Sequence, residues 1–105
     1  MTRQEAEDLL VESNPKALFF DGFDAAIIGI SERINFPPVV TYNKEKILEI
    51  LAEQMEPDED DIEMHGDEES AKQFLAIEYF DFNVAGAYMG EGTPLITTTN
   101  AETLL

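Results

Sequence analysis

The chain has 105 residues, of which six are Lys or Arg and 23 are Asp or Glu, so its formal net charge is -17. Such a chain repels the phosphate backbone of nucleic acids and anionic membrane surfaces, and direct binding of DNA, RNA or lipid is not expected. The absence of cysteine excludes disulfides, thiolate chemistry and sulfur-ligated zinc sites. An apolar share of 44% at this length predicts a single folded domain over residues 1–105.

The N-terminal residues alternate charge with leucine, which is not the pattern of a signal peptide. No window holds the roughly 18 to 20 apolar residues that a membrane span needs. We therefore expect a soluble protein of the cytoplasm.

Residues 2–13 predict a helix, because Thr2 and Glu5 have the spacing of a capping box. Asn14-Pro15 ends this helix, since proline disfavours helical geometry in the residue before it. The apolar runs Ala17–Phe20 and Ala25–Ile30 then predict two strands.

A third strand is predicted over Val39–Tyr42, which is rich in β-branched residues. Pro37-Pro38 at its start favours an edge position, where a missing N–H is not needed. The next segment has helical spacing over Lys44–Met55, and Asn43 is a suitable N-cap for it.

Ten acidic residues lie between Glu53 and Glu69, and no Lys or Arg occurs between Lys46 and Lys72. Blocks of like charge usually stay solvated. We therefore expect residues 56–69 to form an exposed acidic insertion, of which 56–67 is largely unordered.

The residues after this insertion fit two patterns. Phe80, Phe82 and Val84 alternate with polar residues, as in a strand, whereas the window Ala71–Ala87 suits a helix buried on a broad face. A strand of that length would be unusual in so small a sheet, so we expect a helix of roughly four to five turns.

Pro94–Thr98 predicts a last strand, and residues 99–105 are expected to fray. The predicted fold class is α+β. It has a small, mostly antiparallel sheet of about three to four strands, two main helices on one face, and an N-terminal helix.

Two stretches resemble the signatures of a family of small proteins of unknown function, encoded mainly by bacteriophages and some bacteria. They are Asp21–Ile30, read as DGFDAAIIGI, and Ile77–Tyr88, read as IEYFDFNVAGAY and followed by Gly90-Glu91 and Thr93-Pro94. The family has no assigned activity, so the resemblance implies a viral or mobile-element origin and no chemistry. The acidic insertion departs from the family pattern, which usually joins the two helices by a short turn.

The acidic insertion is the first candidate site, and its closely spaced carboxylates suit binding to the basic groove of a protein that processes nucleic acid. The candidate partner-binding residues are Glu56, Asp58, Glu59, Asp60, Asp61, Glu63, Asp67, Glu68 and Glu69. The alternatives are a solvated loop or adaptation of the whole chain to a saline cytoplasm. A calcium loop starting at Asp58 fails, because Glu63 stands where an EF-hand requires glycine.

A second candidate is a polar cluster of Asp21, Asp24, Asp81 and Asn83. Buried polar groups of this kind are usually hydrogen-bonded scaffolding, although paired carboxylates can also hold a metal ion for hydrolysis. His65, the sole histidine, has no second nitrogen or sulfur ligand of familiar type.

No catalytic constellation, metal site or cofactor site is predicted. The leading hypothesis is a non-enzymatic acidic protein of phage type that binds a basic surface of a nucleic-acid-processing protein, as a nucleic-acid mimic or inhibitor. The alternative is a metal-assisted hydrolase or divalent-cation-binding protein that uses Asp21, Asp24 and Asp81.

Overall fold

The computed structural model describes residues 1–100 and has an α+β fold. Contacts divide the chain into two compact units. The first unit comprises Met1–Lys46 together with the chain from Tyr88 on, and the second unit comprises Ile47–Ala87. The expected packing of the main helices on one face of the sheet stays a prediction.

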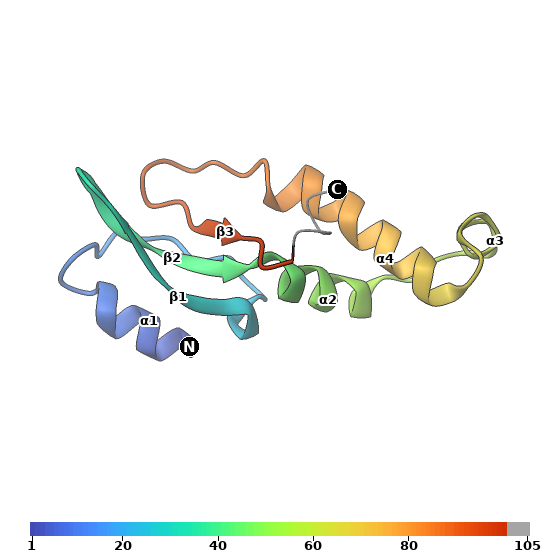
Figure 1. Ribbon diagram of the computed structural model, residues 1–105, viewed down its shortest axis with the longest axis horizontal. Coiled ribbons are helices and arrows are strands. Elements are labelled where there is room, and N and C mark those ends of the chain that lie inside the picture. Colours follow the sequence, from blue (N-terminus) through green and yellow to red (C-terminus); the bar gives the residue numbers. More distant parts are fainter. Residues whose placement is uncertain (101–105) are drawn as a thin grey trace. The chain divides into compact units, whose positions relative to one another are not determined.

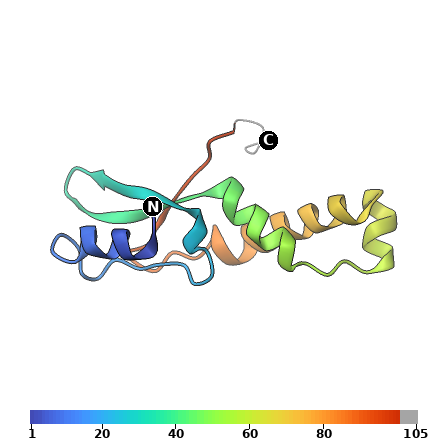
Figure 2. The same cartoon turned by 90° about the horizontal axis from the view of Figure 1, so that it is seen from below.

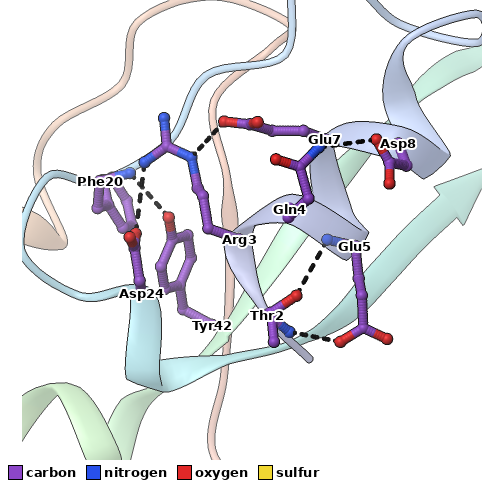
Figure 3. A network of polar contacts seen from close by, with 9 residues as sticks. All are labelled: Thr2, Arg3, Gln4, Glu5, Glu7, Asp8, Phe20, Asp24 and Tyr42. Atoms are coloured by element: carbon purple, nitrogen blue, oxygen red, sulfur yellow. Dashed lines mark hydrogen bonds and ion pairs between the residues drawn. The ribbon is translucent and has the colours of Figure 1, made fainter.

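The first unit begins with helix α1 (Arg3–Leu10), as the sequence predicts. Thr2 caps it through the predicted capping box: the Thr2 hydroxyl accepts from the Glu5 N–H at 3.1 Å, and the Glu5 carboxylate accepts from the Thr2 N–H at 3.0 Å. Figure 3 shows both bonds beside the Arg3 side chain, which reaches Glu7 and Asp24. Capping thus fixes the start of this helix.

Three strands form one mixed sheet in the order β1-β2-β3 (Figure 1). Strands β1 (Ile27–Arg33) and β2 (Phe36–Asn43) pair antiparallel as a hairpin, whereas β3 (Leu95–Thr97) pairs in parallel with the end of β2. The hairpin turn contains Asn35 at φ 69°, a left-handed conformation that asparagine tolerates better than most residues.

The predicted edge position of the Pro37-Pro38 strand is wrong, since β2 is the central strand of the sheet. The two prolines are accommodated because β3 pairs only with Thr41–Asn43, beyond them. On the other side, the β1–β2 register shifts between Ser31 and Arg33, so the prolines lie at an irregularity. Both prolines therefore fall where the ladder does not require their N–H groups.

The predicted strand over Ala17–Phe20 is also wrong, because these residues form no regular element. Their backbone bonds go elsewhere: the Leu18 N–H donates to the Gly92 carbonyl at 2.9 Å, and the Phe20 N–H donates to the Tyr42 hydroxyl at 2.9 Å. The run predicted over Ala25–Ile30 starts with a turn of 3-10 helix, η1 (Asp24–Ala26), before β1 begins.

The core of the first unit lies around the fully buried ring of Tyr42. The Phe20 ring packs against it with centroids 4.9 Å apart. Helix α1 contacts β1 and β2 and contributes the buried residues Ala6 and Leu10. Asn14, also buried, donates from its side-chain amide to the Pro38 carbonyl at 2.8 Å, so this polar group is satisfied.

Helix α2 (Lys44–Gln54) forms as predicted, with the Asn43 side chain accepting from the Lys46 N–H at 2.8 Å. In the second unit, α3 (Glu59–His65) is followed by α4 (Glu68–Tyr79). A π-helical turn, η2 (Phe80–Val84), continues α4, so the prediction of a helix is confirmed over the ambiguous strand pattern. Figure 2 shows α3 and α4 joined by a tight turn.

The buried face of α4 and η2 differs from the predicted broad apolar face. The buried positions are Ala71, Ala76, Phe80 and Val84, whereas Phe74 and Ile77 are 41% and 48% exposed. Alanine thus occupies two of the four buried positions, while Phe74 and Ile77 are left at the surface.

The last strand, predicted over Pro94–Thr98, is confirmed as β3. Within residues 99–105, for which fraying was expected, the N–H groups of Thr99 and Asn100 donate to the Glu45 carboxylate at 3.0 and 2.8 Å. The remainder of that prediction, 101–105, lies outside the described residues. Over residues 1–100, no helix is long and apolar enough to cross a membrane.

Candidate functional site

The negative charge is divided unevenly between the two units. The second unit holds 13 of the 23 acidic residues and one of the six basic residues, so its formal charge is -12 of the total of -17. The first unit, with five basic and ten acidic residues, carries the remaining -5. The second unit is therefore the strongly acidic part of the molecule.

Residues 56–67, expected to be largely unordered, contain the helix α3. Asp58 and Asp61 form a capping box at its start: the Asp58 carboxylate accepts from the Asp61 N–H at 2.8 Å, and the Asp61 carboxylate accepts from the Asp58 N–H at 3.1 Å. Acidic residues in the first turn also suit the positive end of the helix dipole. Gly66, at φ 93°, ends the helix, and its N–H donates to the Ile62 carbonyl.

Local capping thus offsets the repulsion between the carboxylates and holds them on an ordered scaffold. The candidate partner-binding residues are exposed to solvent except Asp61, which is half-buried; they are Glu56, Asp58, Glu59, Asp60, Asp61, Glu63, Asp67, Glu68 and Glu69. These nine residues do not all have the same structural role. Asp58, Asp61 and Asp67 cap helices, and the others project from α3, from the start of α4 or from the preceding segment.

Asp67 connects the acidic segment to α4. Its carboxylate accepts from the Ser70 N–H at 2.7 Å and so caps the helix. This bond favours the charged form and lowers the pKa of the Asp67 carboxyl below its ordinary value. The negative charge at this helix start is therefore retained well into the acidic range.

Lys72 is the only Lys or Arg of the second unit that can offset its negative charge. The Lys72 ammonium lies 3.6 Å from the Glu68 carboxylate one turn away, and the Glu68 side chain is 65% exposed. An exposed pair of this kind contributes little to stability and is screened by salt. This one exposed pair therefore offsets little of the negative charge of the unit.

The four residues of the predicted polar cluster lie in different units and are all exposed. In the first unit, the Asp24 carboxylate accepts from the Arg3 guanidinium at 3.3 Å, as drawn in Figure 3, and Asp21 lies in a turn. In the second unit, the Asn83 amide donates to the Tyr79 carbonyl of its own helix at 3.2 Å. Asp81 and Asn83 are thus solvent-facing helix positions, and no buried polar group needs a partner there.

A metal-assisted site finds no support in this geometry. Among residues 1–100, no group of three or more His, Asp or Glu side chains is placed to hold a metal ion. His65, which lies in the segment 56–67 expected to be largely unordered, is the last residue of α3, and its ring stacks on Phe74 with centroids 4.3 Å apart. The hydrolase alternative stays a prediction.

Two features were missed from the sequence. The first is an exposed apolar stripe on α4 and η2, formed by Phe74, Ile77 and Phe82, which we call the α4 stripe. It was missed because the apolar residues of the window Ala71–Ala87 were expected to lie on a buried face. The second is a shallow cavity of about 210 Å³ in the first unit, lined in part by Phe36 and Tyr88.

Comparison of the chain with known protein families, with curated proteins and with solved structures gives no match.

Proposed function

We propose that the protein is a non-enzymatic binding protein whose acidic second unit engages a positively charged surface on a nucleic-acid-processing protein. One observation carries the proposal: exposed carboxylates are held on the short, capped helix α3 and the first turn of α4, with Lys72 as the only Lys or Arg of the unit.

Order in the acidic segment supports binding over simple solubilisation. A disordered acidic loop must lose conformational entropy when it meets a partner, whereas a capped helix presents its carboxylates in a fixed arrangement. Fixed, closely spaced negative charge resembles the phosphates that a nucleic-acid-binding groove is built to receive. A mimic or inhibitor of such a protein, of the kind that phages use, is the specific role proposed.

Electrostatics predicts how such an association behaves. Clustered charge of one sign accelerates encounter with an oppositely charged surface, and added salt screens the effect. The interaction should therefore weaken steeply as ionic strength rises. The same charge disfavours nucleic acid and anionic lipid as direct partners.

The test is competition for a nucleic-acid site. Purified nucleases and other basic nucleic-acid-binding proteins are each bound to a fluorescent duplex, and the acidic protein is titrated in at low salt. The proposal predicts displacement of the duplex from at least one of them, and loss of the effect when salt is raised to about 0.5 M, where the screening length falls to a few Å.

The key variant is Glu59→Gln with Asp60→Asn and Glu63→Gln, which removes three charges from α3 and leaves its capping box in place. The matched control is Glu12→Gln with Glu32→Gln and Glu91→Gln, which removes three exposed charges from the first unit. Competition should weaken markedly in the first variant and much less in the second. Equal weakening in both would mean that only net charge matters, and an absence of displacement across the panel would overturn the proposal.

A further inference from the structure

The α4 stripe is formed by the three exposed apolar residues of one helical face. Phe74, Ile77 and Phe82 are 41%, 48% and 84% exposed, the Phe74 ring being stacked on His65. Positions i, i+3 and i+8 fall on one side of a helix of ordinary period. Large apolar residues exposed singly need no explanation, but a stripe along one helix is typical of a protein-binding surface.

The π turn places the last member of the stripe. The Ala85 N–H donates to the Phe80 carbonyl at 2.9 Å, five residues back, which is the bond of a π-helix. Through this turn Phe80 and Val84 stay buried while Phe82 faces solvent. Single π turns are rare and occur frequently at functional sites.

Charge around the stripe restricts what can cover it. Glu78 and Asp81, both exposed, lie between Ile77 and Phe82 on the same side of the helix, within a unit of formal charge -12. A second copy of this chain would bring two such surfaces together, and like charges across an interface are strongly unfavourable. Anionic lipid and nucleic acid are disfavoured by the same repulsion.

We propose that the α4 stripe docks a basic amphipathic helix of the partner protein. Apolar side chains of that helix cover Phe74, Ile77 and Phe82, and its Lys or Arg residues flank them opposite Glu78 and Asp81. Helix-on-helix packing of this kind uses apolar anchors at i, i+3, i+4 and i+7 spacing. The inference rests on the proposed function and adds the contact that distinguishes one basic partner from another, because charge attracts any basic surface whereas an apolar stripe needs a matching stripe.

Three synthetic peptides of about 18 residues, long enough to span α4, test this with the full-length protein. The first is an amphipathic helix of Lys and Leu, the second has the same composition in a scrambled order without an apolar face, and the third has the same charge with Gly and Ser in place of Leu. Affinity is measured by fluorescence anisotropy near physiological salt and again at about 0.5 M. The amphipathic peptide should bind at least about tenfold more tightly than the other two, and should keep part of its affinity at high salt.

The variants Phe82→Ala and Ile77→Ala remove stripe residues, and Ile34→Ala is the matched control. Ile34 is 86% exposed and lies in the hairpin turn of the first unit, so the same type of change is made far from the stripe in sequence. Each stripe variant should lower affinity for the amphipathic peptide by roughly tenfold and leave the Gly/Ser peptide unaffected. Ile34→Ala should change neither. Far-UV circular dichroism verifies that α4 is retained in each variant. If one stripe variant fails to fold, the other still tests the stripe.

The outcomes separate the two proposals. If all three peptides bind equally and the stripe variants have no effect, the docking inference is wrong while binding of basic partners stands. If no cationic peptide binds saturably near physiological salt, the proposed function itself fails. If Ile34→Ala weakens binding as much as Phe82→Ala, the apolar contact lies outside the α4 stripe and the inference is overturned.

Discussion

Replacing Tyr42 by Phe tests whether the core of the first unit is closed as described. The Tyr42 hydroxyl accepts the Phe20 N–H at 2.9 Å, both groups are buried, and the Tyr42 side chain is fully shielded from solvent. The phenylalanine ring keeps the packing against Phe20, whose centroid is 4.9 Å away. The change therefore isolates the hydroxyl.

The expected loss of stability arises because the Phe20 N–H would have no hydrogen-bond acceptor in this variant. A buried N–H without an acceptor costs about 1–3 kcal/mol, more than the net gain from an ordinary hydrogen bond. The free energy of unfolding of the first unit should fall by that amount, which corresponds to a lower melting temperature by about 5 °C or more for a chain of this size. Circular dichroism in urea measures the change, since the chain has no tryptophan to serve as a fluorescent reporter.

Hydrogen exchange provides the local measurement, because two units need not unfold as one transition. The Phe20 amide should exchange slowly in the wild type and much faster in Tyr42→Phe, while amides of α4 keep their protection. An unchanged Phe20 exchange rate, or a loss of stability below about 0.5 kcal/mol, would show that water reaches this amide and would refute the described core.

Three further predictions follow from single residues. Gly92→Ala should destabilise the first unit by about 1–3 kcal/mol, because an added Cβ would lie 2.8 Å from the Lys16 carbonyl oxygen. The control is Gly29→Ala, where nothing lies within 4 Å of the added Cβ, and thermal melts should show it to be neutral or slightly stabilising. Burial raises the pKa of the Tyr42 hydroxyl, and the hydrogen bond from the Phe20 N–H partly opposes this shift. The neutral hydroxyl therefore stabilises the fold fully at pH values below the pKa of Tyr42 in the unfolded chain. This stabilisation is lost as the pH rises through the pKa of Tyr42 in the folded protein. Urea titrations between about pH 8 and 11 should show this alkaline loss in the wild type and a smaller one in Tyr42→Phe; equal losses would contradict it. The pKa of the Asp67 carboxyl is lowered from its ordinary value of 3.8. The charged carboxylate therefore stabilises the fold fully at pH values above 3.8, and this stabilisation is lost as the pH falls through the pKa of Asp67 in the folded protein. Asp67→Ala should lower the helical signal of α4, and Asp67→Asn should keep the cap but remove this acid-side loss; identical acid titrations of wild type and Asp67→Asn would refute the capping role.

Elements with explicit local signals were predicted correctly. The Thr2 and Glu5 capping box, the Asn43 cap and the apolar spacing of α2 are short-range features, and each forms the structure that its residues favour. The failures came from long-range contacts. Ala17–Phe20 has the composition of a strand, but its N–H groups are taken by Gly92 and by the Tyr42 hydroxyl, distant residues that no local pattern identifies.

The acidic segment shows a different kind of failure, because a usable signal was present. Asp58 and Asp61 have the spacing of a capping box, but the density of like charge suggested disorder. Exposure of the segment was expected, and helical order was not. The α4 stripe was missed for another reason: the apolar residues of Ala71–Ala87 were expected on a buried face, whereas Phe74, Ile77 and Phe82 are exposed.

An amide NMR titration with the cationic amphipathic peptide shows whether the second unit carries the partner-binding surface. We expect saturable shift changes concentrated in α3, α4 and η2, with Phe74, Ile77 and Phe82 among the most affected and the hairpin turn around Ile34 unchanged. Shift changes centred instead on Phe36 and Tyr88, beside the cavity of the first unit, would contradict it.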